Sequence, residues 1–214
     1  GNLTWLQMKR DGYESDKNDI IVEFKGIKTN LTANWDGTVD NFIWSKDGKT
    51  VFFVAPIDGT KQIFSVNFPG LTKIAINVRQ LTNGDFDVND LVGFSGDDII
   101  VTRTDMNHAA EIYSFNLKKN TWKQISNVNT DTYKTLTLSK TEKRYVTTTD
   151  GKKMLVWVIL PPNFDASKKY PTLLFCQGGP QSALTQSYSF RWNFSLMAAK
   201  GYVVVAPNRR GMPG

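Results

Sequence analysis

By residue type, the side chains best suited to catalysis are the single histidine, His108, and the single cysteine, Cys176. A histidine serves as a general base only within hydrogen-bond reach of its nucleophile, and His108 stands in a polar turn between two strand-like segments. A thiol nucleophile needs an environment that favours the thiolate, together with a partner base. Cys176 lies between Phe175 and Gln177 in an apolar segment, where we expect a small, buried thiol. We therefore predict that neither residue is catalytic.

The remaining residues give little support for metal or cofactor chemistry. One cysteine allows no internal disulfide, and one cysteine with one histidine cannot form a zinc cluster. Asp85, Asp87 and Asp90 have a loose D-x-D-x-x-D spacing, but they lack the full ligand pattern and turn glycine of a calcium-binding loop. A solvated turn is the better interpretation of these three residues. We predict no metal and no cofactor.

The composition is that of an ordinary globular protein, since 40% of the 214 residues are hydrophobic and 21% are charged. The formal charge of +6 comes from scattered basic residues rather than a concentrated stripe, so we expect no nucleic-acid partner. No run approaches the roughly 18 apolar residues of a membrane span. The N-terminal sequence GNLTWLQMKR has no signal-peptide pattern, so any targeting segment would have been removed. We favour a periplasmic or secreted location over a cytoplasmic one.

The elements that would position a site fall into two parts, and the first part repeats. Residues 1–130 contain short strands between turn signals, and IFSV at residues 63–66 aligns with IYSF at residues 112–115. The repeats end alike, in NLT, QLT and QIS at residues 30–32, 80–82 and 124–126. A repeat of about 40–45 residues carrying four strands is typical of a β-propeller blade. We predict the last blades of a propeller, about three in number, at residues 1–32, 36–82 and 84–126.

Residues 131–214 change in character. We predict a hairpin at residues 143–149 and 154–160 with its turn at Asp150 and Gly151. A short strand within residues 170–180, a helix over residues 190–201 and a fully buried strand at residues 202–207 follow. A strand, a crossover helix and a further strand imply a parallel pair. This order is typical of the N-terminal part of an α/β-hydrolase domain. The predicted fold class is therefore mixed β and α/β, a partial propeller followed by the start of a hydrolase domain.

Two segments carry a resemblance to a known family. The sequences LPPNFDASKKYPTLLFCQGGPQS and AAKGYVVVAPNRRGMPG resemble the prolyl oligopeptidase family of serine peptidases, and LQMKRDGYESDKNDIIVEF resembles late propeller blades of its dipeptidyl-peptidase branch. The resemblance implies a serine, aspartate and histidine triad, with the serine on a G-x-S-x-G turn. This chain has no G-x-S-x-G, so we expect an inactive fragment, truncated before the nucleophile. Its parent would hydrolyse short peptides through an acyl-enzyme.

The resemblance also implies roles for two loops. The loop from Gln177 through Gly178 and Gly179 would supply a donor to the oxyanion that forms during acyl transfer. Family members often have tyrosine at the position of Gln177, whereas acylaminoacyl-type members have histidine and use a backbone N–H of the glycines. With glutamine here, we predict the backbone N–H of Gly179, assisted by the Gln177 amide. Asn208 and Arg210 match the family pattern N-x-R-G and would order loops near the site.

Two other interpretations stay open. WSKDGKTVFFVA, at residues 44–55, also resembles TolB-like propellers, which would make the chain a non-catalytic interaction module. A lipase or esterase could share the hydrolase start, although such enzymes rarely carry a preceding propeller. The change at residues 143–214 favours the peptidase, because a pure propeller would continue with further blades. The partners expected are short peptides, the remainder of the parent chain, and a second copy, since an unpaired last strand favours self-association.

Overall fold

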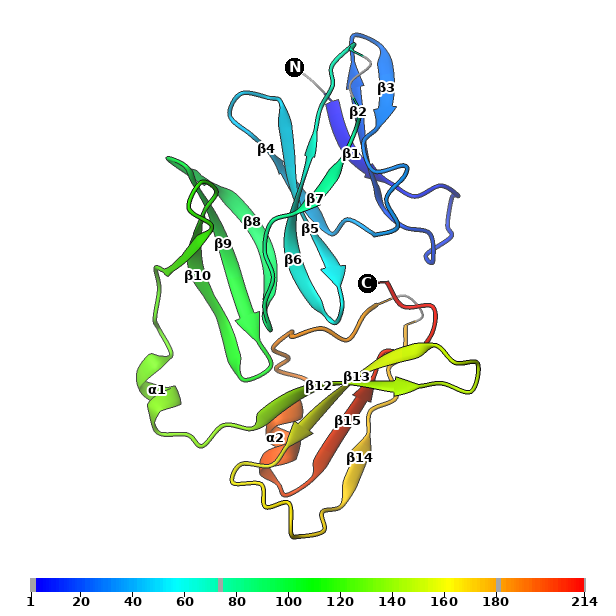
Figure 1. Ribbon diagram of the computed structural model, residues 1–214. Helices are drawn as coiled ribbons and strands as arrows, with labels where there is room; N and C mark the ends of the chain where they lie inside the picture. Colours follow the sequence, from blue (N-terminus) through cyan, green and yellow to red (C-terminus); the bar gives the residue numbers. More distant parts are fainter. Residues whose placement is uncertain (1–2, 73–74, 180–181, 214) are drawn as a thin grey trace.

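The computed structural model describes residues 3–72, 75–179 and 182–213. Within them the chain forms two units that lie end to end (Figure 1). The first unit, residues 3–126, contains only β-strands, and the second unit, residues 140–213, contains a mixed sheet and a helix. A short helix, α1 (Thr130–Lys134), lies in the connection between them.

The first unit is a succession of three antiparallel groups of strands. The first group is β1 (Leu3–Gln7), β2 (Asp19–Phe24) and β3 (Ile27–Asn30). The second is β4 (Asn41–Trp44), β5 (Thr50–Ile57), β6 (Thr60–Asn67) and β7 (Val78–Gln80). The third is β8 (Asp87–Ser95), β9 (Asp98–Asp105), β10 (His108–Asn116) and β11 (Thr121–Gln124). One parallel contact, Lys61 opposite Asp87, joins the second group to the third.

The middle group is buried on both faces. Successive side chains of a strand point to opposite faces, so Phe53 of β5 packs toward the first group and its neighbour Phe52 packs toward the third. Trp35 completes the first of these cores, with its ring 5.3 Å from the rings of both Phe53 and Phe64. This burial on both sides explains why residues 51–55 are uninterruptedly apolar rather than alternating.

The repeated tripeptides have a shared structural role. In the middle repeat, the hydroxyl of Thr82 accepts a hydrogen bond from the N–H of Ile63 at 2.9 Å and donates one to Gln62 Oε1 at 2.8 Å. The other repeats make the same pair of bonds, Thr32 with Ile20 and Asp19, and Ser126 with Ile112 and Glu111. Each tripeptide thus ties the end of its repeat to a polar residue and an isoleucine on an earlier strand.

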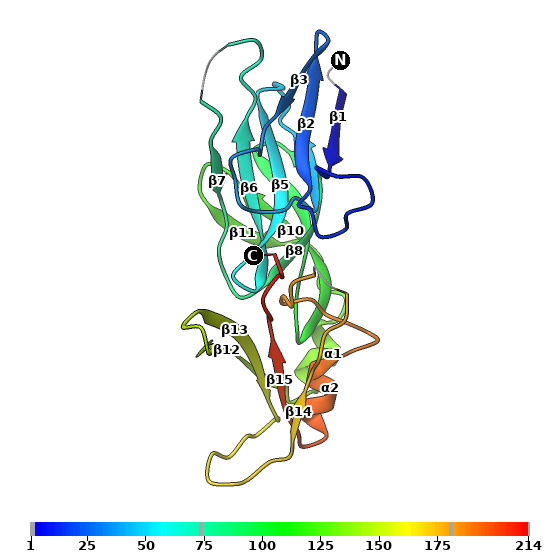
Figure 2. The same ribbon diagram turned by 90° about the vertical axis from the view of Figure 1, so that its right-hand side faces the viewer.

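The second unit is a four-stranded sheet with a helix on one face. Its strands are β12 (Lys140–Thr147), β13 (Lys153–Leu160), β14 (Thr172–Leu174) and β15 (Val203–Pro207), in the order β12-β13-β15-β14. Helix α2 (Phe194–Ala199) connects β14 to β15 and packs on β13 and β15 (Figure 2). The predicted parallel pair is confirmed as β14 and β15, with Leu173 opposite Val204.

Three local predictions are wrong. The helix begins at Phe194 instead of residue 190, because the side chain of Asn193 caps it by accepting the N–H of Leu196 at 2.8 Å. Strand β15 is fully buried on one face only. Val204 and Ala206 are buried against the helix, whereas Val203 and Val205 lie half-buried on the opposite face. Cys176 is exposed, because β14 ends at Leu174 and the thiol lies in the following loop.

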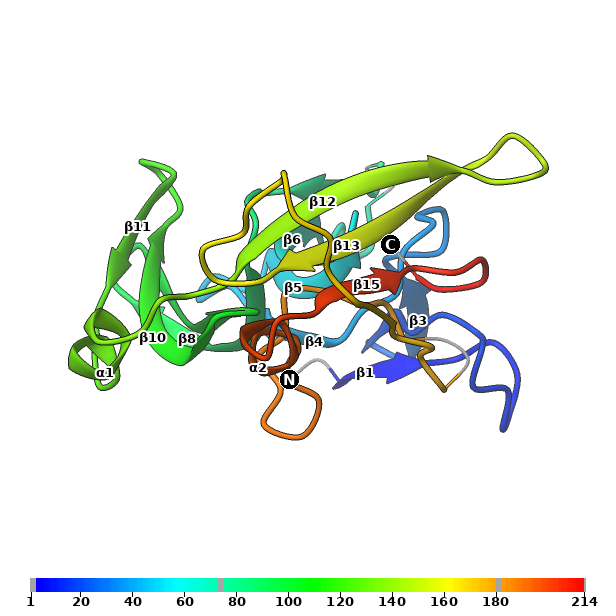
Figure 3. The same cartoon turned by 90° about the horizontal axis from the view of Figure 1, so that it is seen from below.

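The two units contact each other through turns of the first unit. Met106, between β9 and β10, is 3% exposed and belongs to the buried cluster of Trp157, Leu184 and Ala198 in the second unit. Gly59, between β5 and β6, lies against Trp157 and Leu155 of β13. Seen from below, the β12–β13 hairpin crosses the end of β5 and β6 (Figure 3). The second sheet is therefore fixed against the ends of the middle and last strand groups.

Candidate functional site

The predicted site residues lie at the carboxyl ends of the two parallel strands. The loop after β14 contains Gln177, Gly178 and Gly179, and the loop after β15 contains Asn208 and Arg210. Because parallel neighbours end at the same edge of a sheet, both loops leave that edge. The carboxyl ends of parallel strands are where α/β proteins bind ligands.

The glycine loop has an open backbone. Gly179 has φ of +99°, in the region that favours glycine, and no described atom lies within 4 Å of a Cβ built on it. The space beside its Cα is therefore open. Gln177 is half-buried, and within the described part of the chain its Oε1 has no hydrogen-bond partner. Pro180, which completes the sequence motif, lies outside the described residues.

Asn208 connects the loops that follow the two strands. Its side chain accepts the N–H of Leu184 at 2.7 Å and donates to the carbonyl oxygen of Leu184 at 2.9 Å. Trp157 Nε1 donates to the same carbonyl at 3.1 Å. The backbone N–H of Asn208 is held in turn by Leu155 O at 2.8 Å. The chain shortly after the glycine loop is thus fixed against β13 and the end of β15.

Arg210 points to a different neighbour. It forms an ion pair with Asp150 in the turn between β12 and β13, and this hydrogen-bonded pair holds the pKa of Asp150 below its usual value. The side chain of Arg210 is 71% exposed, so solvent screens this pair. The structure therefore brings Asn208 to the chain beyond the glycine loop and brings Arg210 to the hairpin turn.

Asp87 is a participant that the sequence analysis missed. It is fully buried instead of lying in a solvated turn, and its carboxylate accepts hydrogen bonds from Lys61 N, Thr185 Oγ1 and Gln186 N at 2.9, 2.5 and 3.1 Å. Burial raises the pKa of Asp87 to about 6, against the opposing effect of these three donors. Its flanking residues, Phe86 and Val88, are the one sequence signal that indicated burial.

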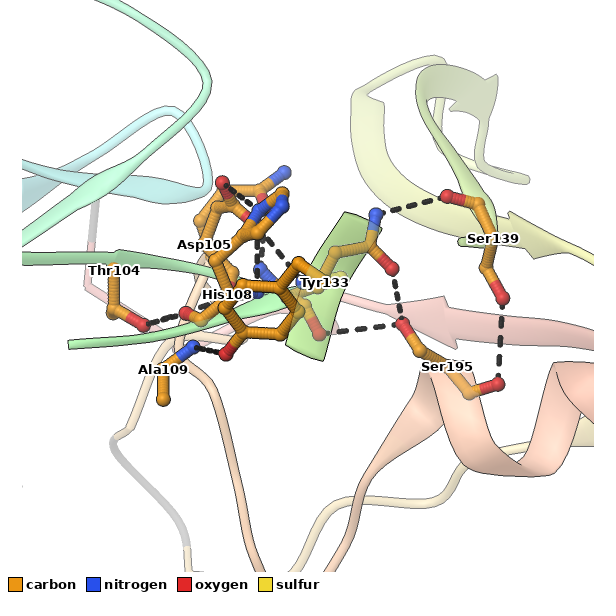
Figure 4. Close-up of polar contacts among 10 residues, drawn as sticks. Thr104, Asp105, His108, Ala109, Tyr133, Ser139 and Ser195 are labelled. Atoms are coloured by element: carbon orange, nitrogen blue, oxygen red, sulfur yellow. Dashed lines mark hydrogen bonds and ion pairs between the residues drawn. The ribbon is translucent and has the colours of Figure 1, made fainter. Parts of the chain in front are cut away.

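His108 belongs to a polar cluster between the two units (Figure 4). Its Nδ1 lies 2.8 and 2.9 Å from the two carboxylate oxygens of Asp105, and this hydrogen bond raises the pKa of His108. The ring of Tyr133 packs edge-on against the imidazole at 4.8 Å. The nearby Ser195 hydroxyl donates to Asn107 Oδ1 at 2.7 Å. Among the described residues no hydroxyl is hydrogen-bonded to the imidazole, so these groups do not form a nucleophile and base.

A cleft of about 670 Å³ lies between the units beside the site. The first unit lines it with Asp36 and Asp40, among other residues, and Asp40 is paired with Lys61 at 2.7 Å. The second unit lines it with Ser182, Ala183 and residues 211–213. These residues follow the predicted site residues along the chain, and the predicted site residues themselves do not line the cleft.

The described ranges contain no helix with the length and apolar character of a membrane span. Nor do they bring three or more histidine, cysteine, aspartate or glutamate side chains together in a way that could hold a metal ion. Asp85, Asp87 and Asp90 have separate partners, in Lys143, Thr185 and Thr102 respectively.

Known proteins resemble this chain along its whole length. Dipeptidyl-peptidase 5 of Porphyromonas gingivalis is 38% identical over 215 residues, covering 100% of this chain and 31% of that protein. Dipeptidyl-peptidase 5 of Porphyromonas endodontalis is 42% identical over 216 residues, covering 99% of this chain and 30% of that protein. The chain thus spans about a third of the length of these relatives.

A solved structure and a family model agree with these relatives. The structure of Pyrococcus horikoshii acylaminoacyl peptidase has a TM-score of 0.78 at 20% identity, covering 100% of this chain and 32% of that one, which shows a shared fold. The model described as the dipeptidyl peptidase IV N-terminal region matches residues 13–155. Because this match covers most of the chain, the protein belongs to the dipeptidyl peptidase IV N-terminal region family.

Proposed function

We propose that this chain is part of a serine peptidase of the dipeptidyl-peptidase type, which hydrolyses short peptides through an acyl-enzyme. The observation that carries the proposal is the match to two dipeptidyl-peptidases 5 over essentially the whole chain, at 38% and 42% identity. No G-x-S-x-G occurs in the 214 residues. The nucleophile therefore belongs to the rest of the parent protein, and the chain by itself is inactive. The non-catalytic TolB-like alternative gains no support from these relatives.

In this proposal the two units have separate tasks. Residues 1–130 are the last blades, about three, of a β-propeller, which is supported by the repeated strand groups and their shared tripeptide bonds. Residues 131–214 begin an α/β-hydrolase domain, which is supported by the parallel pair β14–β15 and the helix between them. The cleft between the units admits the peptide, because the segments that follow the predicted site residues along the chain line it.

The glycine loop stabilises the transition state of acyl transfer. Attack on a peptide carbonyl places negative charge on its oxygen, and preorganised N–H groups lower the energy of that charge. We assign this donor to the N–H of Gly179, a glycine whose φ of +99° suits a tight turn and whose Cβ position is open. Gly178 and Gln177 precede it in the chain, and the side-chain amide of Gln177, whose buried Oε1 has no partner among the described residues, assists the donor. Asn208 orders the chain that follows the loop, and Arg210 orders the hairpin turn.

The proposal is tested with Gly179→Ala in the full-length parent, assayed on the dipeptide substrate Ala-Ala-p-nitroanilide. Alanine is strained at φ of +99°, so the donor shifts, and we expect kcat to fall about 100-fold, the usual loss for one oxyanion donor. The matched control is Gly201→Ala, which has a similar φ of +89° in equally open surroundings beyond α2. It should lower stability without lowering kcat.

A fluorophosphonate probe distinguishes the peptidase from the alternative. The full-length parent should be labelled on a serine, whereas this chain alone should stay unlabelled because it holds no nucleophile turn. A parent that neither reacts with the probe nor releases p-nitroaniline contradicts the peptidase proposal. A labelled, active parent in which Gly179→Ala and Gly201→Ala have equal kcat values contradicts only the role of Gly179.

A further inference from the structure

A second pocket, of about 470 Å³, lies on the third strand group beside α1 and is called the Arg103 pocket below. Strands β9 and β10 line it with Arg103, Asp105, Glu111 and Tyr113, and α1 lines it with Tyr133. Among the described residues, none lines both this pocket and the cleft between the units. The two site loops do not line it either, so the pocket is separate from the candidate active site.

The guanidinium of Arg103 packs against three aromatic rings. Its central carbon lies 3.6 Å from the centre of the Phe86 ring, 4.9 Å from that of Tyr113 and 5.3 Å from that of Trp122. Contacts of this kind hold the cation against the ring faces and leave its N–H groups free to donate. Within the described part of the chain, these N–H groups have no hydrogen-bond acceptor.

The two carboxylates of the pocket are directed to other donors. Asp105 accepts the N–H of His108 at 3.0 Å, and its Oδ1 lies 2.8 Å from His108 Nδ1 (Figure 4). Glu111 accepts the hydroxyl of Ser126. Neither carboxylate forms an ion pair with Arg103 in the described structure, so the positive charge of Arg103 has no counter-ion there.

Burial makes an unpaired guanidinium costly. Arg103 is half-buried, and its withdrawal from water lowers the pKa of Arg103 below the ordinary value. Donors that leave water without gaining an acceptor cost free energy, and the cost is larger for charged groups. The negative faces of the rings compensate part of this cost. An anion in the pocket would supply the acceptors that the described residues do not.

Further donors line the same pocket. The hydroxyl of Tyr133 accepts the N–H of Ala109 at 2.7 Å, which leaves its own hydrogen for another acceptor. The hydroxyl of Tyr113 and Nε2 of His108 have no partner among the residues that the structure describes. A carboxylate offers about four acceptor positions on two oxygens, and the planar fork of a guanidinium matches its shape. The donor set therefore fits a carboxylate.

We propose that the Arg103 pocket is a second binding site, which takes the free carboxylate of a short peptide. Arg103 binds this carboxylate through two parallel N–H groups, and the hydroxyl of Tyr113 adds a third donor. The choice of a peptide rests on the proposed peptidase function, because each turnover of such an enzyme releases a dipeptide with a new carboxylate. The volume of the pocket lies within the range of small-ligand sites.

The test is labelling of arginines in the full-length parent with phenylglyoxal, read for each residue by mass spectrometry. The reactive serine is first blocked with the fluorophosphonate probe, so that the dipeptide Ala-Ala does not occupy the catalytic site. Ala-Ala near saturation should slow labelling of Arg103 about tenfold, because only unoccupied sites react. The amide of Ala-Ala, which lacks the carboxylate, should slow it less than about twofold. Arg144, which is paired with Glu142, is the internal control and should react at an unchanged rate.

A second readout is calorimetric titration of the same blocked parent with Ala-Ala. Arg103→Lys keeps the positive charge but loses the fork, and should weaken binding at least about tenfold. Tyr113→Phe keeps the ring against Arg103 and loses only the hydroxyl, so binding should weaken about three- to tenfold. The matched control is Arg144→Lys, the same exchange at an exposed ion pair of β12, which should leave binding unchanged.

Each unfavourable outcome contradicts a different part of the proposal. Equal protection of Arg103 by Ala-Ala and by its amide overturns recognition of the carboxylate. An Arg103 that is already unreactive in the ligand-free parent, with no binding in the titration, overturns the site, because another part of the parent then fills the pocket. A parent that the fluorophosphonate does not label contradicts the peptidase function, while labelling of Arg103 with and without Ala-Ala still decides whether the pocket binds.

Discussion

At the scale of single residues, Asp87 is a carboxylate kept charged at a cost. Its raised pKa means that the folded chain binds a proton more tightly than the unfolded chain does, in the range between the ordinary value of 3.8 and about 6. Stability therefore falls as pH rises through this range and is constant above it. The difference between these two pKa values lowers the unfolding free energy at neutral pH by roughly 3 kcal/mol relative to its value at acidic pH.

The Asp87→Asn variant should remove this pH dependence. The amide keeps the hydrogen-bond geometry without the desolvated charge, so the variant should be more stable than the parent at pH 7 and closer to it at pH 4. Urea unfolding at several pH values between 4 and 8 measures this. A parent chain whose stability rises between pH 4 and 6 through a step missing from Asp87→Asn would show that the sign is wrong.

Residue-scale prediction from the sequence succeeded where a partner is local and failed where it is distant. The turn glycine Gly151 could be judged from its neighbours along the chain, and it has the positive φ, +77°, that such a turn requires. Asp87 could not, because its partner Thr185 is 98 positions away. Its spacing with Asp85 and Asp90 suggested a solvated turn, whereas packing of the second unit against β8 decided its burial.

At the scale of elements, the tripeptides at the ends of the repeats carry information that the alternation of apolar and polar residues along a strand does not. A strand pattern specifies which face is buried, but the hydroxyl of Thr82 and its equivalents specify which earlier strand each repeat returns to. The sequence indicated that these tripeptides recur. It could not indicate their bonds, because the acceptors Asp19, Gln62 and Glu111 differ in type.

Thr82→Val should be the more damaging of two matched substitutions. It leaves Gln62 Oε1 and the N–H of Ile63 buried without the hydroxyl, at a cost of roughly 2–3 kcal/mol in unfolding free energy. Thr121→Val changes an exposed residue of β11 and should cost less than about 0.5 kcal/mol. Urea unfolding of both variants compares them, and equal losses would contradict the proposed role of the hydroxyl.

Element boundaries were predicted less well than element types. The parallel pair followed from the strand–helix–strand order, and the turn at Asp150 and Gly151 from its sequence. The helix start was misplaced because the cap at Asn193, rather than the apolar position Phe190, determines where the helix begins. Phe190 is 88% exposed, so its spacing with later apolar residues was a coincidence of pattern.

At the scale of the whole molecule, the fit between the units depends on a glycine. Gly59 has φ of +71°, and a Cβ there would lie 3.0 Å from both methyl carbons of Leu155 and from Trp157 Nε1. A side chain at this turn therefore requires Leu155 and Trp157 to shift by a few tenths of an ångström. Nothing in the sequence distinguishes Gly59 from other turn glycines, because the contact exists only once the units have packed together.

Gly59→Ala should therefore weaken the contact between the units. We expect a loss of roughly 1–3 kcal/mol in unfolding free energy beyond the backbone strain itself. Gly48→Ala is the matched control, because its φ of +66° is similar and no described atom lies within 4 Å of the added Cβ. Limited proteolysis of the connection at residues 127–139 should be faster in Gly59→Ala only, and equal cleavage in both variants would contradict the tight fit.

Strand β14 leaves the ribosome before β15, yet β15 is the strand that must lie between β14 and β13. During translation the β12–β13 hairpin can form at once from local contacts. Leu173 and Leu174 of β14, by contrast, have no strand to pair with until residues 203–207 have emerged. Exposed apolar strands without partners are aggregation-prone and attract chaperones. The nascent chain thus passes through an interval of vulnerability whose length is set by the rate at which the intervening residues are synthesised.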